Sequence, residues 1–305
     1  MYIVLFNLCL LTVSAEAAAG TQAVEANPIL TELMEKGVMM SDGKAYKLPA
    51  PAMADVLDAA GQKAAIEKIA GGRFTFEELV QKTTSAPVMI RIRTLKAAEG
   101  ESATIRAIDV WFVAHGKWDT LNSKDFQDSL AKSKDTEGEN RIVSKSGILT
   151  DEEMQKRKLK LETPEGQEVK FVYATFSLFD QVEVSATRYV VVTREKSDLM
   201  TAARIDGRFA KDAEYPNQWR PILRDAAANI SLGPRQPYSG AGAYVKITRL
   251  AEPADAIFVE GHIVFEEPYG WFEGGNELRS KAPTMIQQRA KIFRSKLGIA
   301  SAKQK

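Results

Sequence analysis

The chain has 305 residues, of which 45% are hydrophobic and 27% charged, so it is long enough for one large domain or two small ones and is not a disordered chain. Its 41 basic and 40 acidic residues nearly cancel, which excludes a charge field of the whole protein that favours nucleic acid or an anionic membrane. Cys9 is the single cysteine, so the chain cannot form an internal disulfide.

The N-terminal segment has the pattern of an export signal. Residues 3–13 form a nearly continuous apolar run, and small residues follow it, which predicts a signal peptide over residues 1–17 with cleavage after Ala15 or Ala17. The run is too short to cross a membrane, since a spanning helix needs roughly 20 apolar residues. We therefore expect a secreted or periplasmic protein without a stable membrane span and, once Cys9 is removed, without cysteine chemistry. The alternative is a buried N-terminal helix.

Residues 18–86 are predicted to form a helical N-terminal region. Asn27-Pro28 is a good helix start. Apolar residues recur at roughly helical spacing over residues 53–69, and Thr75-Phe-Glu-Glu78 has the spacing of a capping box.

The hydrophobic period changes from helical to alternating at Pro87. Residues 88–93 and 103–113 read as one antiparallel hairpin, and residues 169–179 and 182–194 as a longer one, because both pairs are rich in β-branched and aromatic residues. Residues 213–242, in contrast, read as a long irregular loop.

The C-terminal quarter combines a hairpin with a long helix. Residues 244–250 and 257–265 are predicted to pair, and a helix is predicted from Pro283 to Leu297, with Gly298 as its stop. The predicted fold is therefore an α+β domain over residues 87–298, in which a long C-terminal helix grips an antiparallel sheet.

No residue pattern in the sequence indicates an enzyme. His115 and His262 would form a metal or acid-base site only if the fold brought them to a carboxylate such as Glu260 or Glu266, and their spacing lacks the pattern of a metal site, so we predict no metal and no cofactor. No Gly-x-Ser-x-Gly elbow, phosphate-binding loop or basic-aromatic nucleic-acid surface is present.

A cluster of glutamates leaves a hydrolase open as an alternative. Two carboxylates at a suitable separation would hydrolyse a glycan or ester, but sequence cannot give that separation. The candidates are Glu260, Glu266, Glu267, Glu273 and Glu277.

The order of elements in the last sixty residues resembles the START-like, or helix-grip, lipid-transfer superfamily. The matching residues are the hairpin of residues 244–250 and 257–265, the exit Glu267-Pro-Tyr-Gly-Trp271 and the helix from Pro283. The resemblance implies a helix that grips a curved sheet, a hydrophobic cavity for lipids or other apolar ligands, and no essential catalytic residues.

We accordingly predict a non-enzymatic binding protein for an apolar small molecule or lipid, with no nucleic-acid partner. Its ligand site is expected to use aromatic residues and the apolar face of the terminal helix, namely Trp111, Trp271, Phe272, Ile286 and Phe293. A carboxylate-dependent hydrolase and a structural or interaction protein of the cell envelope are the two alternatives.

Overall fold

An 11-stranded antiparallel sheet forms the body of the protein. The computed structural model describes residues 26–100, 102–131, 145–227, 229–272 and 276–303. The predicted signal peptide and Glu273 lie outside these residues. The strands of the large sheet are β3 (Met89–Lys96), β4 (Thr104–His115), β5 (Lys145–Ile148), β6 (Gln167–Leu178), β7 (Val182–Arg194), β8 (Asp198–Ile205), β9 (Gln218–Arg224), β10 (Ile230–Leu232), β11 (Gln236–Pro237), β12 (Ala241–Arg249) and β13 (Ala256–Glu267).

The three predicted hairpins are confirmed. β3 pairs with β4, β6 with β7, and β12 with β13, each in antiparallel register. The tight β6–β7 turn places Phe179 and Asp180 at positive φ. The three hairpins belong to one sheet, because β13 pairs along its whole length with β4, and β8 pairs with β7 on one edge and with β12 on the other.

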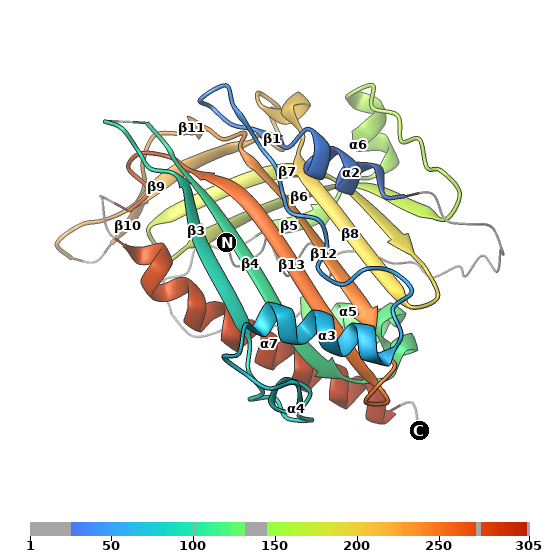
Figure 1. The fold of residues 1–305 in the computed structure, drawn as a ribbon. Helices are drawn as coiled ribbons and strands as arrows, with labels where there is room; N and C mark the ends of the chain where they lie inside the picture. Colours follow the sequence, from blue (N-terminus) through green and yellow to red (C-terminus); the bar gives the residue numbers. More distant parts are fainter. Residues whose placement is uncertain (1–25, 101, 132–144, 228, 273–275, 304–305) are drawn as a thin grey trace.

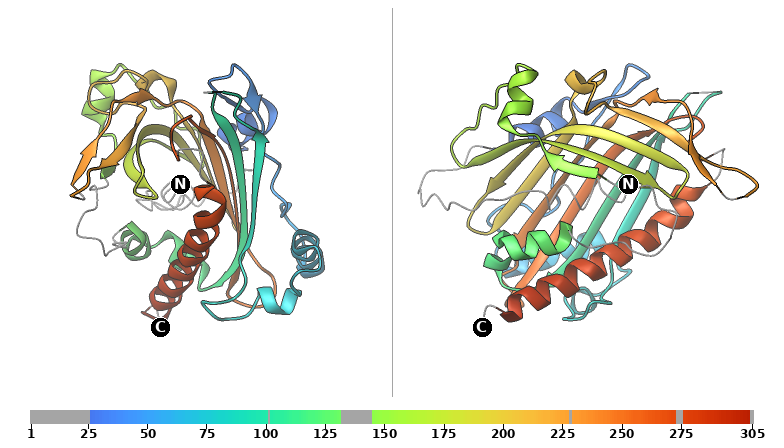
Figure 2. Two further views of the ribbon diagram at one scale, coloured as in Figure 1. Left: turned by 90° about the vertical axis from the view of Figure 1, so that its left-hand side faces the viewer. Right: turned by 180° about the vertical axis from the view of Figure 1, so that it is seen from behind.

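The sheet is strongly curved and has helices on both faces (Figure 1, Figure 2). Helix α7 (Glu277–Lys303) crosses the inside of the curve beside α5 (Lys124–Ala131), and we call this side the inner face. The outer face carries α2 (Pro28–Glu35), α3 (Ala59–Ala70), α4 (Phe76–Leu79) and α6 (Asp151–Lys156). Two short 3₁₀ helices complete the elements, η1 (Trp118–Asn122) and η2 (Gly207–Phe209).

The N-terminal region is not the helical unit that we predicted. Between α2 and α3 the chain forms a two-stranded ribbon, β1 (Val38–Met39) with β2 (Ala45–Tyr46), followed by extended segments. The helix predicted over residues 53–69 begins only at Ala59, because the side chain of Asp58 caps it there. These elements pack on the outer face of the large sheet.

The boundaries of two other predictions were also wrong. Helix α7 begins at Glu277, so Pro283 lies inside it, and the helix runs past Gly298 because this glycine does not adopt the left-handed conformation of a helix stop. The predicted loop over residues 213–242 contains the short strands β9, β10 and β11.

Candidate functional site

The inner face of the sheet is almost entirely apolar. Alternation along the strands sends one set of side chains to this face, and these side chains form a single buried cluster with α7. On β7 the inner positions from 182 to 192 hold valine or alanine with the exception of Arg188. The outer face is divided instead into three smaller clusters, one under α2, one under α3 and α4, and one under α6.

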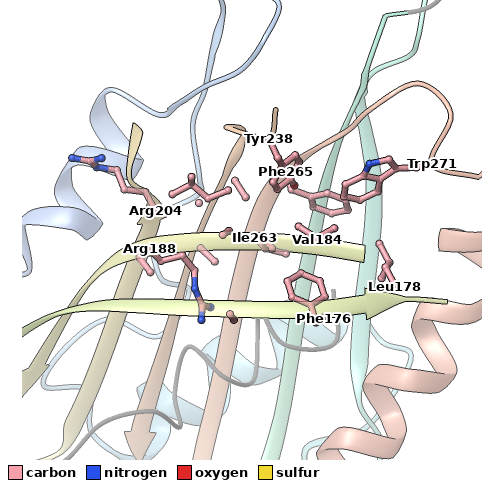
Figure 3. Close-up of a pocket in the computed structure, with 16 residues that line it drawn as sticks. Phe176, Leu178, Val184, Arg188, Arg204, Tyr238, Ile263, Phe265 and Trp271 are labelled. Carbon is pink, nitrogen blue, oxygen red and sulfur yellow. The ribbon is translucent and has the colours of Figure 1, made fainter. Parts of the chain in front are cut away.

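Part of the inner face is hollowed into a pocket, away from the helix α7. The curl of the sheet brings β6 and β7 opposite β12 and β13, and the pocket lies between them (Figure 3). Its empty space is about 580 Å³ with the open mouth included, of which about 30 Å³ can hold the centre of a water molecule. The pocket is therefore narrow. Its lining side chains include Phe176, Leu178, Val184, Ala186, Ile205, Tyr238, Ala243, Ile263, Phe265 and Trp271.

Arg188 is a buried cation in this apolar lining. The residue is 4% exposed, and its Nη1 and Nη2 atoms have no hydrogen-bond partner in the part of the chain that the structure describes. Burial lowers the pKa of Arg188 to about 10, so the group stays charged at neutral pH. Removing an ion from water without a partner costs several kcal/mol, so the burial of Arg188 destabilises the fold.

The position of Arg188 follows from a fork in the sheet. Val182–Ser185 of β7 pair with β9, whereas Arg188–Arg194 pair with β8, so Arg188 is the first residue beyond the fork. Asn217 bridges the gap, since its side chain accepts a hydrogen bond from the backbone N–H of Thr187 at 2.8 Å. Figure 3 places Arg188 at one end of the pocket and Trp271 at the other.

The other polar residues of the pocket differ from Arg188 in their partners. Arg204 turns away from the pocket and pairs with Glu32 of α2 at 3.1 Å (Figure 3). The hydroxyl group of Tyr238 donates to the backbone oxygen of Glu266 at 3.1 Å. The indole N–H of Trp271 is buried and has no acceptor among the residues that the structure describes. Among the described lining residues of the pocket, the buried side-chain donors without an acceptor are therefore the guanidinium group of Arg188 and the indole N–H of Trp271, and none of these residues is acidic.

The five predicted ligand-binding residues do not form one site. Trp271 lines the pocket, and Phe272 stacks edge-on against it with ring centres 5.9 Å apart. Ile286 and Phe293 of α7 are instead buried in the inner cluster, where Phe293 packs against Phe112 of β4 and Phe126 of α5. Trp111 lies on the outer face, where its indole N–H donates to Glu260 at 3.1 Å. Ligand contact by these residues stays a prediction, but Trp111 cannot share an inner-face site with the others.

Helix α7 is anchored by a second buried arginine. Arg294 is 5% exposed, and its guanidinium group donates to four backbone oxygens: Val113 at 2.7 Å, Ala86 at 2.6 Å, Pro87 at 3.0 Å and Thr84 at 3.3 Å. These bonds tie the helix to β4 and to the segment that precedes β3. Arg294 therefore has the partners that Arg188 lacks.

The outer face holds a polar cluster around His262, one of the two histidines that the sequence analysis considered for a metal or acid-base site. His262 lies between two carboxylates, 2.7 Å from Asp109 and 2.8 Å from Glu260. Burial disfavours the imidazolium ion, but hydrogen bonds and attraction from both carboxylates outweigh it and raise the pKa of His262. Glu260 also accepts hydrogen bonds from the backbone N–H groups of Ala52 and Met53, so the cluster fastens the N-terminal segment to the sheet.

The remaining histidine and glutamates are also engaged with neighbours. His115 contacts the backbone oxygen of Val80 at 2.8 Å, and burial lowers the pKa of His115. The glutamates pair with side chains outside the pocket: Glu266 with Ser41, Glu267 with Arg106 and Glu277 with Lys281. Within the described ranges no group of three or more His, Cys, Asp and Glu is placed to hold a metal ion, and no helix is long and apolar enough to cross a membrane.

Comparison with known proteins gives a distant likeness of fold. No protein-family model matches the chain, and no curated protein matches it. The human StarD13 (DLC2) lipid transfer and protein localization domain is similar at a TM-score of 0.33 and 7% identity, over 77% of this chain and 95% of that one. Human STARD10 is similar at a TM-score of 0.34 and 10% identity, over 78% and 81%. The predicted START-like resemblance is confirmed to this extent, as a distant likeness of fold.

Sequence reasoning missed Arg188 and most of the pocket wall. The available signal was the alternation in β7, where a single charged residue interrupts a run of apolar inner positions. Alternation alone does not distinguish the inner from the outer face. Ala186, Ile263 and Phe265 carried no signal beyond that of ordinary core residues.

Proposed function

We propose that this protein is a non-enzymatic binding protein that holds an apolar small molecule or lipid in the pocket of the inner face. The observation that carries the proposal is the lining of the pocket, in which apolar side chains from β6, β7, β12 and β13 converge. Ligand pockets are typically concave, mostly apolar and supplied with a few polar groups, and this one has that character. The mature protein would act outside the cytoplasm, as its N-terminal segment predicts.

The shape of the pocket favours a thin and flexible ligand. The empty space of about 580 Å³ includes the open mouth, and only about 30 Å³ accepts the centre of a water molecule, so a small molecule fits only if lining side chains move. A ligand must therefore part the side chains of Phe176, Phe265 and Trp271. A single hydrocarbon chain needs less displacement than a rigid ring system, so we propose an acyl or alkyl chain.

The hydrolase alternative receives less support from the same geometry. The described glutamates that were its candidates are engaged in hydrogen bonds or ion pairs, and none of them lines the pocket. A glycosidase needs two free carboxylates that flank the scissile bond. The binding hypothesis instead needs only the apolar enclosure.

Titration with a long-chain fluorescent alcohol tests the proposal. We expect saturable binding by the wild-type protein and a loss of at least tenfold in affinity for Ala186→Phe, which adds a phenyl group inside the pocket. Ile148→Phe is the matched control, because residue 148 is 44% exposed on β5 and lies outside the pocket. No saturable binding by folded wild-type protein, together with no co-purified apolar molecule in native mass spectrometry, would end the proposal in favour of an envelope interaction protein.

A further inference from the structure

Arg188 has no structural partner to explain its burial. It is the one charged residue on the inner positions of β7 between 182 and 192, and it is 4% exposed. Neither Nη atom has a hydrogen-bond partner, and no carboxylate is paired with it among the described residues. A buried ion of this kind is normally matched by an opposite charge or by several acceptors.

Two other arginines of the same protein provide the comparison. Arg294 is equally buried, but four backbone oxygens accept its N–H groups. Arg204 also borders the pocket, but Glu32 neutralises it on the other side of the sheet. Both of these arginines are satisfied within the chain, whereas the Nη atoms of Arg188 have no partner among the described residues.

The chemistry of the pocket specifies what would satisfy Arg188. A guanidinium group offers parallel N–H donors that match the two oxygens of a carboxylate or phosphate. The rest of the lining is apolar except for Arg204, which is paired, and for the Tyr238 hydroxyl and the Trp271 N–H at the opposite end from Arg188. No lining residue is acidic, so the pocket has no counter-charge for a choline or ethanolamine group.

We propose that Arg188 binds the anionic head of the ligand, and that the ligand is an amphiphile with a single oxyanion group at the end of an apolar chain. This inference rests on the proposed function, since it concerns the same pocket. The anion lies against Arg188 at one end of the pocket, and the chain runs between β6–β7 and β12–β13 toward Trp271 at the other. A zwitterionic phospholipid is disfavoured because its cation would be left without a partner.

Competition of four 12-carbon ligands against the fluorescent alcohol tests this assignment in the full-length mature protein. The ligands are dodecanoate, dodecyl phosphate, dodecanol and dodecylphosphocholine. With wild-type protein we expect one of the two simple anions to bind about 10- to 100-fold more tightly than dodecanol, which is the range of one charge-assisted hydrogen-bonded pair. Which of the two anions binds more tightly distinguishes a carboxylate from a phosphate headgroup.

Substitutions then locate the anion site. Arg188→Met should abolish the preference for the anion and leave dodecanol binding unchanged, whereas Arg188→Lys should keep part of the preference because it keeps the charge. Arg204→Met is the matched control and should keep the full preference, since Arg204 already has a partner.

The outcomes separate this inference from the proposed function. Equal binding of anions and dodecanol by wild-type protein would overturn the role of Arg188 and leave the apolar pocket standing. A preference that survives in Arg188→Met would overturn it as well. Failure of all four ligands to compete, with no binding of the fluorescent alcohol, would remove the proposed function itself. The wild-type comparison needs no variant, so the test holds even if Arg188→Met does not fold.

Discussion

The two buried arginines allow one substitution to be tested in opposite surroundings. Arg294→Met and Arg188→Met both remove a guanidinium group and keep an unbranched apolar side chain of similar length. Arg294→Met leaves four backbone oxygens without their donor, and the oxygens of Val113 and Ala86 are buried. Arg188 leaves none.

The expected magnitudes follow from these partners. A buried acceptor without a donor costs about 1–3 kcal/mol, so Arg294→Met should lower the free energy of unfolding by about 2–5 kcal/mol. For a chain of this size such a loss corresponds to a decrease in melting temperature of roughly 3–8 °C. Replacing an unpaired buried charge by an apolar group is neutral or stabilising, so Arg188→Met should leave the free energy of unfolding unchanged or raise it by about 1–4 kcal/mol.

Urea unfolding followed by far-UV circular dichroism measures both changes. The dependence of the free energy on urea concentration should be the same for wild type and both variants, because the surface exposed on unfolding is the same. If Arg188→Met destabilises the protein as much as Arg294→Met does, Arg188 has structural partners and the argument for an unsatisfied cation is wrong.

Three further predictions concern other parts of the molecule. The pKa of His262 is raised in the folded state, so protonated His262 stabilises the fold below its unfolded pKa of about 6.5, and this contribution is lost as pH rises through the folded pKa. The melting temperature of the wild type should therefore fall over that pH range, and that of His262→Gln should not. Gly242→Ala should lower the free energy of unfolding by about 1–3 kcal/mol, since a Cβ atom there would lie 2.4 Å from a side-chain carbon of β1. Gly147→Ala is the control: its Cβ atom would meet nothing within 4 Å, so the free energy of unfolding in the same urea assay should not change. The intact mass of protein from its native host should give a mature start at Glu16 or Ala18, and a retained Met1 would contradict the predicted signal peptide.

The hairpins could be predicted from sequence because alternation and turn chemistry are local. Residues 169–179 and 182–194 alternate over their whole length and are separated by a two-residue turn, so both pairing and register follow. β9, β10 and β11 escaped prediction because they are short and two of them contain proline. Whether such segments form strands depends on their tertiary pairing and not on their sequence propensity.

The site was harder to predict because it depends on which residues meet across the sheet. Trp111 and Phe112 are neighbours in sequence but lie on opposite faces, and only the fold assigns the outer face to Trp111. The apolar face of the terminal helix was correctly identified from its spacing. Ile286 and Phe293, however, fill a packed core, while the hollow lies where β7 forks. The change of strand partner along β7, which lies beside this hollow, has no sequence signature.

The pairing of β13 with β4 also determines when the molecule can be completed during synthesis. Trp111 and Glu260 are directly opposite each other in the sheet, although they are 149 residues apart in the chain. The β3–β4 hairpin must therefore wait for almost the whole polypeptide before it gains its second neighbour. A chain of this topology remains incompletely folded until its last strand has emerged from the ribosome, which makes truncated products prone to aggregation.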